Sequence, residues 1–213
     1  MARSNGCCNS VIPTNAARPF SRYAAILDRP RVRQILSERA GGHVLEIGAG
    51  CLRNALYLQS RGYSVSILEV RGIEERFPEQ YRRFRQSGGQ VLFSLSTGVV
   101  YDIALATFVF ETICRPQHRN ALLRTIFGHL RPDSPLITST RGPADLVTAH
   151  ASGVPCSDGF LTPARTFSRS FTRAQFSRLL SRAGFCKVEF LHGSKTVAPE
   201  YLYAIAWAGT SGD

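Results

Sequence analysis

Two carboxylates and two glycines in the first third of the chain have the residue types and the spacing of a nucleotide-binding site. Glu46 lies in the short apolar run Val44–Ile47, and Gly48 and Gly50 follow that run as a Gly-x-Gly turn. Such a turn lets the backbone bend tightly under a ligand, where any Cβ would collide. Glu69 lies within the roughly 20-residue offset at which an acid accepts hydrogen bonds from ribose hydroxyls. The pattern therefore indicates a ligand that contains adenosine.

The segments between these residues predict a strand, a helix and a second strand. Residues 52 to 58 space their apolar side chains as a helix buried on one face does, and Gly62 then ends the helix. Residues 63 to 68 alternate between apolar and polar as a strand does. The third glycine of a dinucleotide site is replaced by Arg53. Because that glycine allows close packing beneath a pyrophosphate, the arginine disfavours NAD or FAD.

The combination of apolar-x-Glu-x-Gly-x-Gly with an acid ending the next strand resembles motif I and its successor in class I S-adenosylmethionine-dependent methyltransferases. The resemblance implies S-adenosylmethionine as the cofactor, with Glu46 helping to hold the site and Glu69 binding the ribose. Many relatives bind adenine with an acid after the third strand, where this chain offers Ser94. The residues expected to bind the cofactor are Tyr23, Glu46, Gly48, Ala49, Gly50, Glu69, Val70, Ser94, Thr107 and Phe108.

The remaining pattern completes an α/β, Rossmann-like three-layer sandwich. The expected sheet is mostly parallel and seven-stranded, and it ends in an antiparallel hairpin like the one that closes the methyltransferase fold. A capping box formed by Thr172 and Gln175 predicts the start of the last helix, with Phe171 and Phe176 as a hydrophobic staple. Further helices are expected over 73–86 and 117–130, and further strands over 90–94, 101–107, 136–140, 186–191 and 201–207.

Length and composition predict one domain. The chain has 213 residues and 44% hydrophobic content, enough for one substantial core. We expect a disordered tail over 1–16, a single domain over 17–213 with a helical cap over 17–40, and an acceptor lid over 141–170. The cap should break at Asp28–Pro30, since proline cannot continue a helix. The lid should be a loop, since no regular pattern persists there and loops of this length are usually functional.

The candidate catalytic residues lie after the predicted central strand and within the lid. They are Glu111, which follows Thr107 and Phe108, together with Arg141 and His150. The unperturbed pKa of a histidine suits base catalysis near neutrality. Two of the candidates have an ordinary alternative, namely a solvated helix start for Glu111 and a bystander in a loop for His150. An Asn/Asp-Pro-Pro-Tyr/Phe signature is absent here, which disfavours amino methylation of adenine, cytosine or glutamine.

The acceptor is expected to be a small molecule, because a 30-residue lid suits an enclosed pocket. Nucleic acid is the alternative enzyme acceptor, because the net charge is +11 and a basic face binds phosphate. All but two of the 26 basic residues are arginines, a bias that base composition of the genome also produces. Residues 106–109 with the arginine-rich helix after them, and residues 158–162 with 166–167, also resemble methyltransferases found beside DNA phosphorothioation systems. A non-catalytic cofactor-binding scaffold is the third alternative.

The sequence gives no sign of a metal site or of a membrane partner. Six cysteines are present without Cys-x-x-Cys spacing, so neither a zinc site nor a disulfide framework is indicated. No apolar stretch approaches the roughly 18 residues of a membrane span, and the N-terminal residues have no apolar signal core. A cytoplasmic protein is expected, and its oligomeric state is not predicted.

Overall fold

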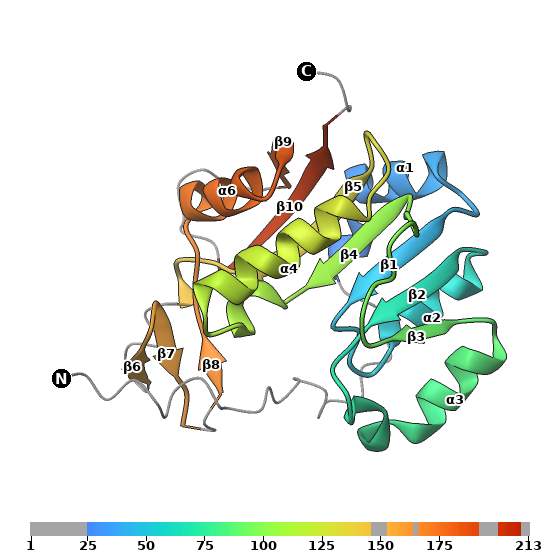
Figure 1. Cartoon of the computed structure of the whole chain (residues 1–213). Coiled ribbons are helices and arrows are strands. Elements are labelled where there is room, and N and C mark those ends of the chain that lie inside the picture. The colour runs from blue at the N-terminus through green and yellow to red at the C-terminus, as the bar shows by residue number, and fades with distance from the viewer. Residues whose placement is uncertain (1–24, 146–152, 164–165, 192–199, 210–213) are drawn as a thin grey trace.

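A computed structural model describes residues 25–145, 153–163, 166–191 and 200–209, and it has a central seven-stranded sheet (Figure 1). The strand order is β3-β2-β1-β4-β5-β10-β9, with β1 to β5 parallel and β10 antiparallel to both of its neighbours. The strands are β1 (His43–Ile47), β2 (Ser64–Leu68), β3 (Gln90–Leu92), β4 (Ile103–Thr107), β5 (Pro135–Arg141), β9 (Phe185–Phe190) and β10 (Tyr201–Ala208).

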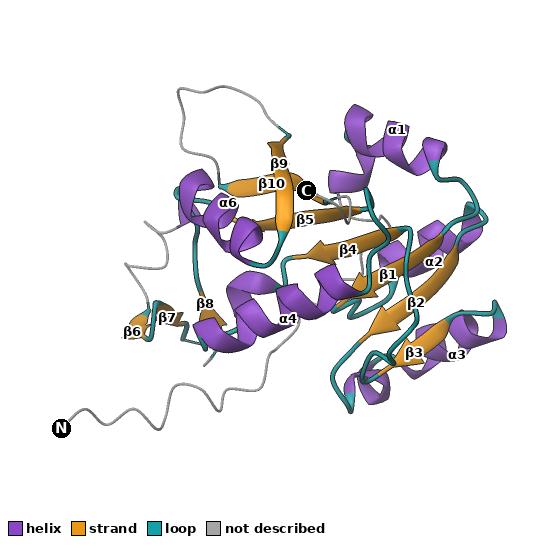
Figure 2. Ribbon diagram, turned by 45° about the horizontal axis from the view of Figure 1, so that its top comes forward, coloured by secondary structure: helices purple, strands orange, loops and turns teal. Residues whose placement is uncertain are grey.

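Helices cover both faces of the sheet and complete three layers (Figures 1 and 2). The helices α1, α2 and α3 pack against one face of the sheet and share a first apolar cluster with it. The helices α4 and α6 pack against the opposite face and share a second apolar cluster with it. The helices are η1 (Ala25–Asp28), α1 (Pro30–Glu38), α2 (Arg53–Ser60), η2 (Ile73–Arg76), α3 (Pro78–Gln86), η3 (Phe110–Thr112), α4 (Pro116–Gly128) and α6 (Arg173–Arg182). The predicted α/β sandwich is confirmed.

The central strands β1 and β4 are continuous apolar runs because both faces of the sheet are covered. The order of the strands changes direction between β1 and β4. From β1 the chain continues outward to β2 and β3, whereas β4 and β5 lie on the other side of β1. Ligands of open α/β sheets bind beyond the carboxyl ends of the strands at such a switch point. The fold therefore places the ends of β1 and β4 where a site is expected.

Two predicted elements differ from the structure for local reasons. The helix expected over 73–86 is divided into η2 and α3 at Phe77, because Pro78 has no N–H to continue the first helix and instead begins the second. The strand expected over 90–94 ends at Leu92, so Ser94 lies two residues beyond it. The predicted break in the helical cap is confirmed at Arg29, between η1 and α1.

The prediction that 141–170 is an irregular loop is wrong. β5 extends to Arg141, and a separate antiparallel sheet is formed by β6 (Val154–Cys156), β7 (Gly159–Leu161) and β8 (Phe167–Ser168). These strands have two or three residues each, too few for a periodic pattern to reveal them. The small sheet lies on the side toward which the arrowheads of β1 and β4 point (Figure 1).

Residues 1–24 and 146–152 lie outside the described part of the chain. The expectations for the tail over 1–16, for Tyr23 and for His150 therefore stay predictions. Within the described ranges, no helix is long and apolar enough to cross a membrane.

The capping box of α6 is formed as predicted, and it yields a test of the fold. The Thr172 hydroxyl accepts a hydrogen bond from the Gln175 amide, and the Gln175 side chain accepts one from the Thr172 amide. We expect Thr172→Ala to lower the free energy of unfolding by about 1 kcal/mol, because such a cap satisfies otherwise unpaired amides. Urea denaturation measures the effect, and exposed Thr125→Ala in α4 is the control, with a change below about 0.5 kcal/mol.

Candidate active site

The turn after β1 has the conformation that its glycines allow. Gly48 and Gly50 have φ of +64° and +56°, in the left-handed region that favours glycine. A Cβ on Gly48 would also lie 3.0 Å from Val109 Cγ2, so the segment that follows β4 approaches this turn closely. Leu52, with φ of +65°, then begins α2 without a side-chain cap. A buried leucine in this conformation is a strained position that the sequence did not reveal.

Glu69 joins the end of β2 to the glycine turn. Its Oε1 accepts a hydrogen bond from the Gly50 amide at 2.5 Å, and its Oε2 accepts one from the Val70 amide at 3.2 Å. Burial raises the pKa of the Glu69 carboxyl, while the two amide bonds act in the opposite direction. The two features on which the sequence interpretation depends therefore meet at one point, at the carboxyl edge of the sheet.

Glu46 lies beneath the same edge with one oxygen unused. Its side chain is buried, and its Oε1 accepts a hydrogen bond from Asn54 Nδ2 at 2.8 Å. Asn54 also contacts Thr107 Oγ1 at 3.4 Å, so the ends of β1 and β4 share this polar group. Among the described residues Glu46 Oε2 has no partner at hydrogen-bond geometry. Burial raises the pKa of Glu46 to about 7, although the hydrogen bond from Asn54 lowers it. A buried, unpaired acceptor of this kind fits a ligand that brings a donor.

Tyr81 is a site residue that sequence reasoning missed. It lies in α3 with its side chain buried, and its hydroxyl has no hydrogen-bond partner within the described residues. Its pKa is raised, first by burial and then by the charges of Glu69 and Glu46. The only signal was an apolar spacing with Phe84, which indicates a core residue. The structure instead brings a second unpaired polar group to the same edge.

The other predicted cofactor residues are distributed along this edge. Ala49 is buried inside the turn, whereas the Val70 side chain is 54% exposed directly after Glu69. Ser94 is exposed beyond the end of β3, and next to it the Phe93 ring lies 5.1 Å from the Arg71 guanidinium carbon. These residues present an apolar and aromatic surface beside the acid.

The end of β4 carries a strained aromatic residue. Phe108 follows Thr107 with φ of +58°, and its amide donates a hydrogen bond to the Ser139 carbonyl. Its ring packs edge-on against Tyr201 of β10, with the ring centroids 5.3 Å apart. Non-glycine residues in the left-handed region cost of order 1 to 3 kcal/mol and cluster at functional sites. Phe108 and Tyr201 thus form an aromatic wall at the carboxyl edge.

Glu111 is buried, so the alternative of a solvated helix start is wrong. It lies in η3, and its Oε2 accepts a hydrogen bond from the Thr140 hydroxyl at 3.1 Å. Arg141, at the end of β5, pairs with both oxygens of Asp145 at 2.9 and 3.0 Å. The structure therefore brings two of the three catalytic candidates to adjacent strand ends.

The buried position of Glu111 predicts a pH-dependent stability. Burial raises its pKa from 4.5 to about 7, against the Thr140 hydrogen bond. Between these values the folded protein holds a proton that the unfolded chain has released, so stability falls as pH rises through this window. We expect Glu111→Gln to remove this loss. Between pH 5 and pH 8, the free energy of unfolding of the variant should rise relative to that of the wild type by about 2 to 3 kcal/mol. Urea denaturation across this range measures the difference, and Glu38→Gln on the exposed face of α1 is the control. A parallel pH dependence in wild type and Glu111→Gln would contradict the prediction.

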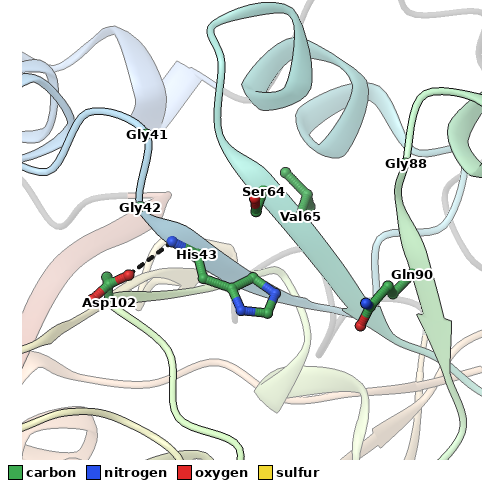
Figure 3. Close-up of a pocket in the computed structure, with 8 residues that line it drawn as sticks. All are labelled: Gly41, Gly42, His43, Ser64, Val65, Gly88, Gln90 and Asp102. Carbon is green, nitrogen blue, oxygen red and sulfur yellow. Dashed lines mark hydrogen bonds between the residues drawn. The ribbon is translucent and has the colours of Figure 1, made fainter.

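A cavity of about 340 Å³ opens at the opposite edge of the sheet, at the amino ends of β1 and β2 (Figure 3). His43 and Asp102 line it, and the His43 amide donates a hydrogen bond to Asp102 Oδ2 at 2.8 Å. Burial lowers the pKa of the His43 ring. This cavity is separated by the length of the strands from the glycine turn, and it contains none of the predicted site residues. Within the described residues no cluster of three His, Cys, Asp or Glu side chains could hold a metal ion.

Solved structures with the same arrangement of helices and strands identify the fold. No family model and no curated protein sequence matches the chain. An S-adenosylmethionine-dependent methyltransferase from Methanosarcina mazei matches with a TM-score of 0.66 and 17% identity, over 85% of this chain and 98% of the other. The chain has the class I methyltransferase fold.

Two further structures share the methyltransferase fold, and one of them was solved with a small molecule bound. One is the 1,6-didemethyltoxoflavin N1-methyltransferase of Burkholderia thailandensis, solved with 1,6-didemethyltoxoflavin and S-adenosylhomocysteine bound. It has a TM-score of 0.58 and 20% identity, over 86% of this chain and 80% of the other. The other is the CcbJ methyltransferase of Streptomyces caelestis, with a TM-score of 0.62 and 15% identity, over 88% and 94%. Identities at this level establish the methyltransferase fold and leave the acceptor open.

Proposed function

We propose that this protein is an S-adenosylmethionine-dependent methyltransferase that acts on a small-molecule acceptor. The observation that carries the proposal is the contact between the Glu69 carboxylate and the amide of Gly50, at the switch point of the sheet. This contact holds an acid and a backbone turn side by side where the fold binds its ligands. The acid is then in position to accept hydrogen bonds from ribose hydroxyls.

The unpaired polar groups of the edge fit the proposed cofactor. Glu46 Oε2 is a buried acceptor and the Tyr81 hydroxyl is a buried donor, and neither has a partner among the described residues. The cofactor contains an amino group, a carboxylate and two ribose hydroxyls, which supply donors and acceptors of both kinds. Val70 offers an exposed apolar surface to the adenine, and Ser94 offers a hydroxyl beyond β3. Tyr23 is proposed to contact the cofactor carboxylate.

The acceptor is proposed to bind against the aromatic wall formed by Phe108 and Tyr201. Edge-on rings present a rigid, mostly apolar surface, which suits a planar or apolar small molecule. Glu111 and Arg141 lie at the adjacent strand ends, and His150 is proposed as a third group on the acceptor side. The parallel pairing of β4 with β5 supports the proposed positions of Glu111 and Arg141.

The mechanism requires little acid–base chemistry from the protein. The bound cofactor supplies a sulfonium methyl group, which is already strongly electrophilic. The work of this chain would be to orient the acceptor beside the cofactor and to exclude water. Glu46, Glu69 and the glycine turn fix the cofactor side, while Phe108 and Tyr201 fix the acceptor side.

Isothermal titration calorimetry with S-adenosylmethionine and S-adenosylhomocysteine tests the proposal directly. We expect saturable binding of one equivalent of each by the folded protein. Mass spectrometry of extracts incubated with labelled cofactor then identifies acceptors, which gain about 14 Da when a hydrogen is replaced by methyl. The absence of binding by protein that is folded by circular dichroism would overturn the proposal.

Incubation with RNA and DNA separates the small-molecule proposal from its alternatives. Methyl incorporation into nucleic acid, with retention on heparin that falls steeply with salt, would replace the small-molecule acceptor by nucleic acid. Cofactor binding without methyl transfer to any extract component would favour the non-catalytic scaffold.

A further inference from the structure

A second cavity lies between α4, α6 and β8, on the face of the sheet that carries α4. Its volume is about 320 Å³, and none of its lining residues is among those proposed to bind the cofactor. Four of the lining residues are arginines, one is an aspartate and one is a phenylalanine, namely Arg119, Arg169, Arg178, Arg182, Asp158 and Phe171. We refer to this site as the α4–α6 cavity.

Two of the arginines are fixed in place by the rest of the structure. Arg119 is 2% exposed, and its Nη1 and Nη2 contact the two oxygens of Asp158 at 3.1 and 3.0 Å. Arg169 forms an ion pair with the same carboxylate. Both guanidinium groups lie over the Phe171 ring, at 5.4 and 4.5 Å from its centroid. The Asp158 carboxylate therefore pairs with the guanidinium groups of both Arg119 and Arg169.

The cavity carries more positive charge than its own residues neutralise. Within the described part of the chain, neither Arg178 nor Arg182 has a carboxylate at ion-pair distance, and both are exposed at the mouth. Four guanidinium groups thus face one aspartate. The Nε atoms of Arg119 and Arg169 are buried and also lack hydrogen-bond partners there. Charges removed from water in this way are costly unless an opposite charge accompanies them.

The first turn of α4 adds to the positive electrostatic potential of the cavity. Pro116 begins this 13-residue helix and lines the cavity, and the helix has no side-chain cap at its start. The amino end of a helix carries a partial positive charge, which stabilises an anion. At the start of α4, Pro116 has no N–H and the His118 and Arg119 amides donate to the Arg115 carbonyl, so the contribution of this helix is its partial charge. In contrast, the start of α6 is already satisfied by its capping box.

We propose that the α4–α6 cavity binds the phosphate group of a ligand. Guanidinium groups present planar pairs of donors that match phosphate oxygens, and several of them together select this dianion over chloride. Arg119 and Arg169 form the rigid base, and Arg178 and Arg182 close over the bound group from α6. Because the cavity shares no residue with the cofactor edge, this site and the proposed methyl transfer stand or fall separately.

Calorimetric titration with inorganic phosphate at constant ionic strength tests the site. We expect saturable binding of one phosphate per chain that chloride does not displace, and a loss of affinity of at least tenfold in Arg178→Ala/Arg182→Ala. Both residues are exposed, so the variant is expected to fold. The matched control is Arg83→Ala/Arg124→Ala, which removes two exposed helix arginines that do not line the cavity. No saturable binding by the wild type, or an equal loss in the control pair, would overturn the proposal.

Labelled oligonucleotides distinguish the source of the phosphate. A decanucleotide with a 5′-phosphate that displaces inorganic phosphate, while the same strand without it does not, supports a terminal phosphate ester as the ligand. Equal displacement by both strands, still lost in Arg178→Ala/Arg182→Ala, supports backbone phosphates of nucleic acid at the same site. Displacement by neither strand, with inorganic phosphate still bound, assigns the site to small phosphorylated molecules.

Discussion

Glu69→Ala is expected to weaken the binding of S-adenosylmethionine by roughly 10- to 150-fold. Hydrogen bonds that involve a charged partner contribute about 1.5 to 3 kcal/mol, and 1.4 kcal/mol corresponds to a factor of ten. The same substitution removes the acceptor for the Gly50 and Val70 amides, so the turn loses its support as well. Calorimetric titration with the cofactor and with S-adenosylhomocysteine measures both dissociation constants.

Two further variants separate the effect of the Glu69 charge on cofactor binding from its effect on the glycine turn. Glu69→Gln keeps an oxygen for the Gly50 amide, so it should preserve the turn and still lose affinity for the ribose hydroxyls. Glu75→Ala removes an exposed carboxylate nearby in the sequence and should bind as the wild type does. Equal affinity in Glu69→Ala and the wild type would show that the end of β2 does not hold the ribose.

Gly48→Ala is expected to destabilise the fold more than Gly50→Ala, although both glycines have positive φ. The left-handed conformation costs an alanine about 1 to 2 kcal/mol at either position. Only at Gly48 does the new Cβ also meet Val109 Cγ2 at 3.0 Å, and overpacking of this kind adds about 1 to 3 kcal/mol. At Gly50 no atom lies within 4 Å of the new Cβ. Urea denaturation of the two variants measures the difference.

Val109→Ala provides the decisive comparison for this close approach. Combined with Gly48→Ala it should recover the overpacking part of the loss, because it removes the methyl group that the new Cβ meets. Combined with Gly50→Ala it should recover nothing. If Val109→Ala gives the same change in both backgrounds, the contact between the glycine turn and the segment after β4 has no energetic role.

The parts of the fold that were predicted correctly depend on local sequence. The strand and turn around Gly48, the break at Arg29 and the capping box at Thr172 each have a signal within a few residues. The proline at position 78 carried a signal of the same kind, and a helix through it should not have been expected.

The parts that could not be predicted depend on contacts between distant residues. Glu111 is buried beside Thr140, a residue 29 positions later that donates a hydrogen bond to it. Tyr81 joins the site only because α3 packs against the face of the sheet that α1 and α2 also cover, and its own spacing fits a core residue equally well. The strands β6 to β8 are too short for a period of two to be recognised, and Asp158 beside them finds its arginines on α4 and after β8.

The position of β10 has a consequence for how the molecule is made. It is the last strand of the described chain, yet it lies inside the sheet between β5 and β9, and it carries the Tyr201 ring that packs against Phe108. A nascent chain that emerges from the ribosome in sequence order exposes the unpaired edge of β5 until this strand arrives. The strand β10 must therefore be synthesised before the aromatic wall can exist, and a product that stops short of β10 presents an open edge prone to self-association.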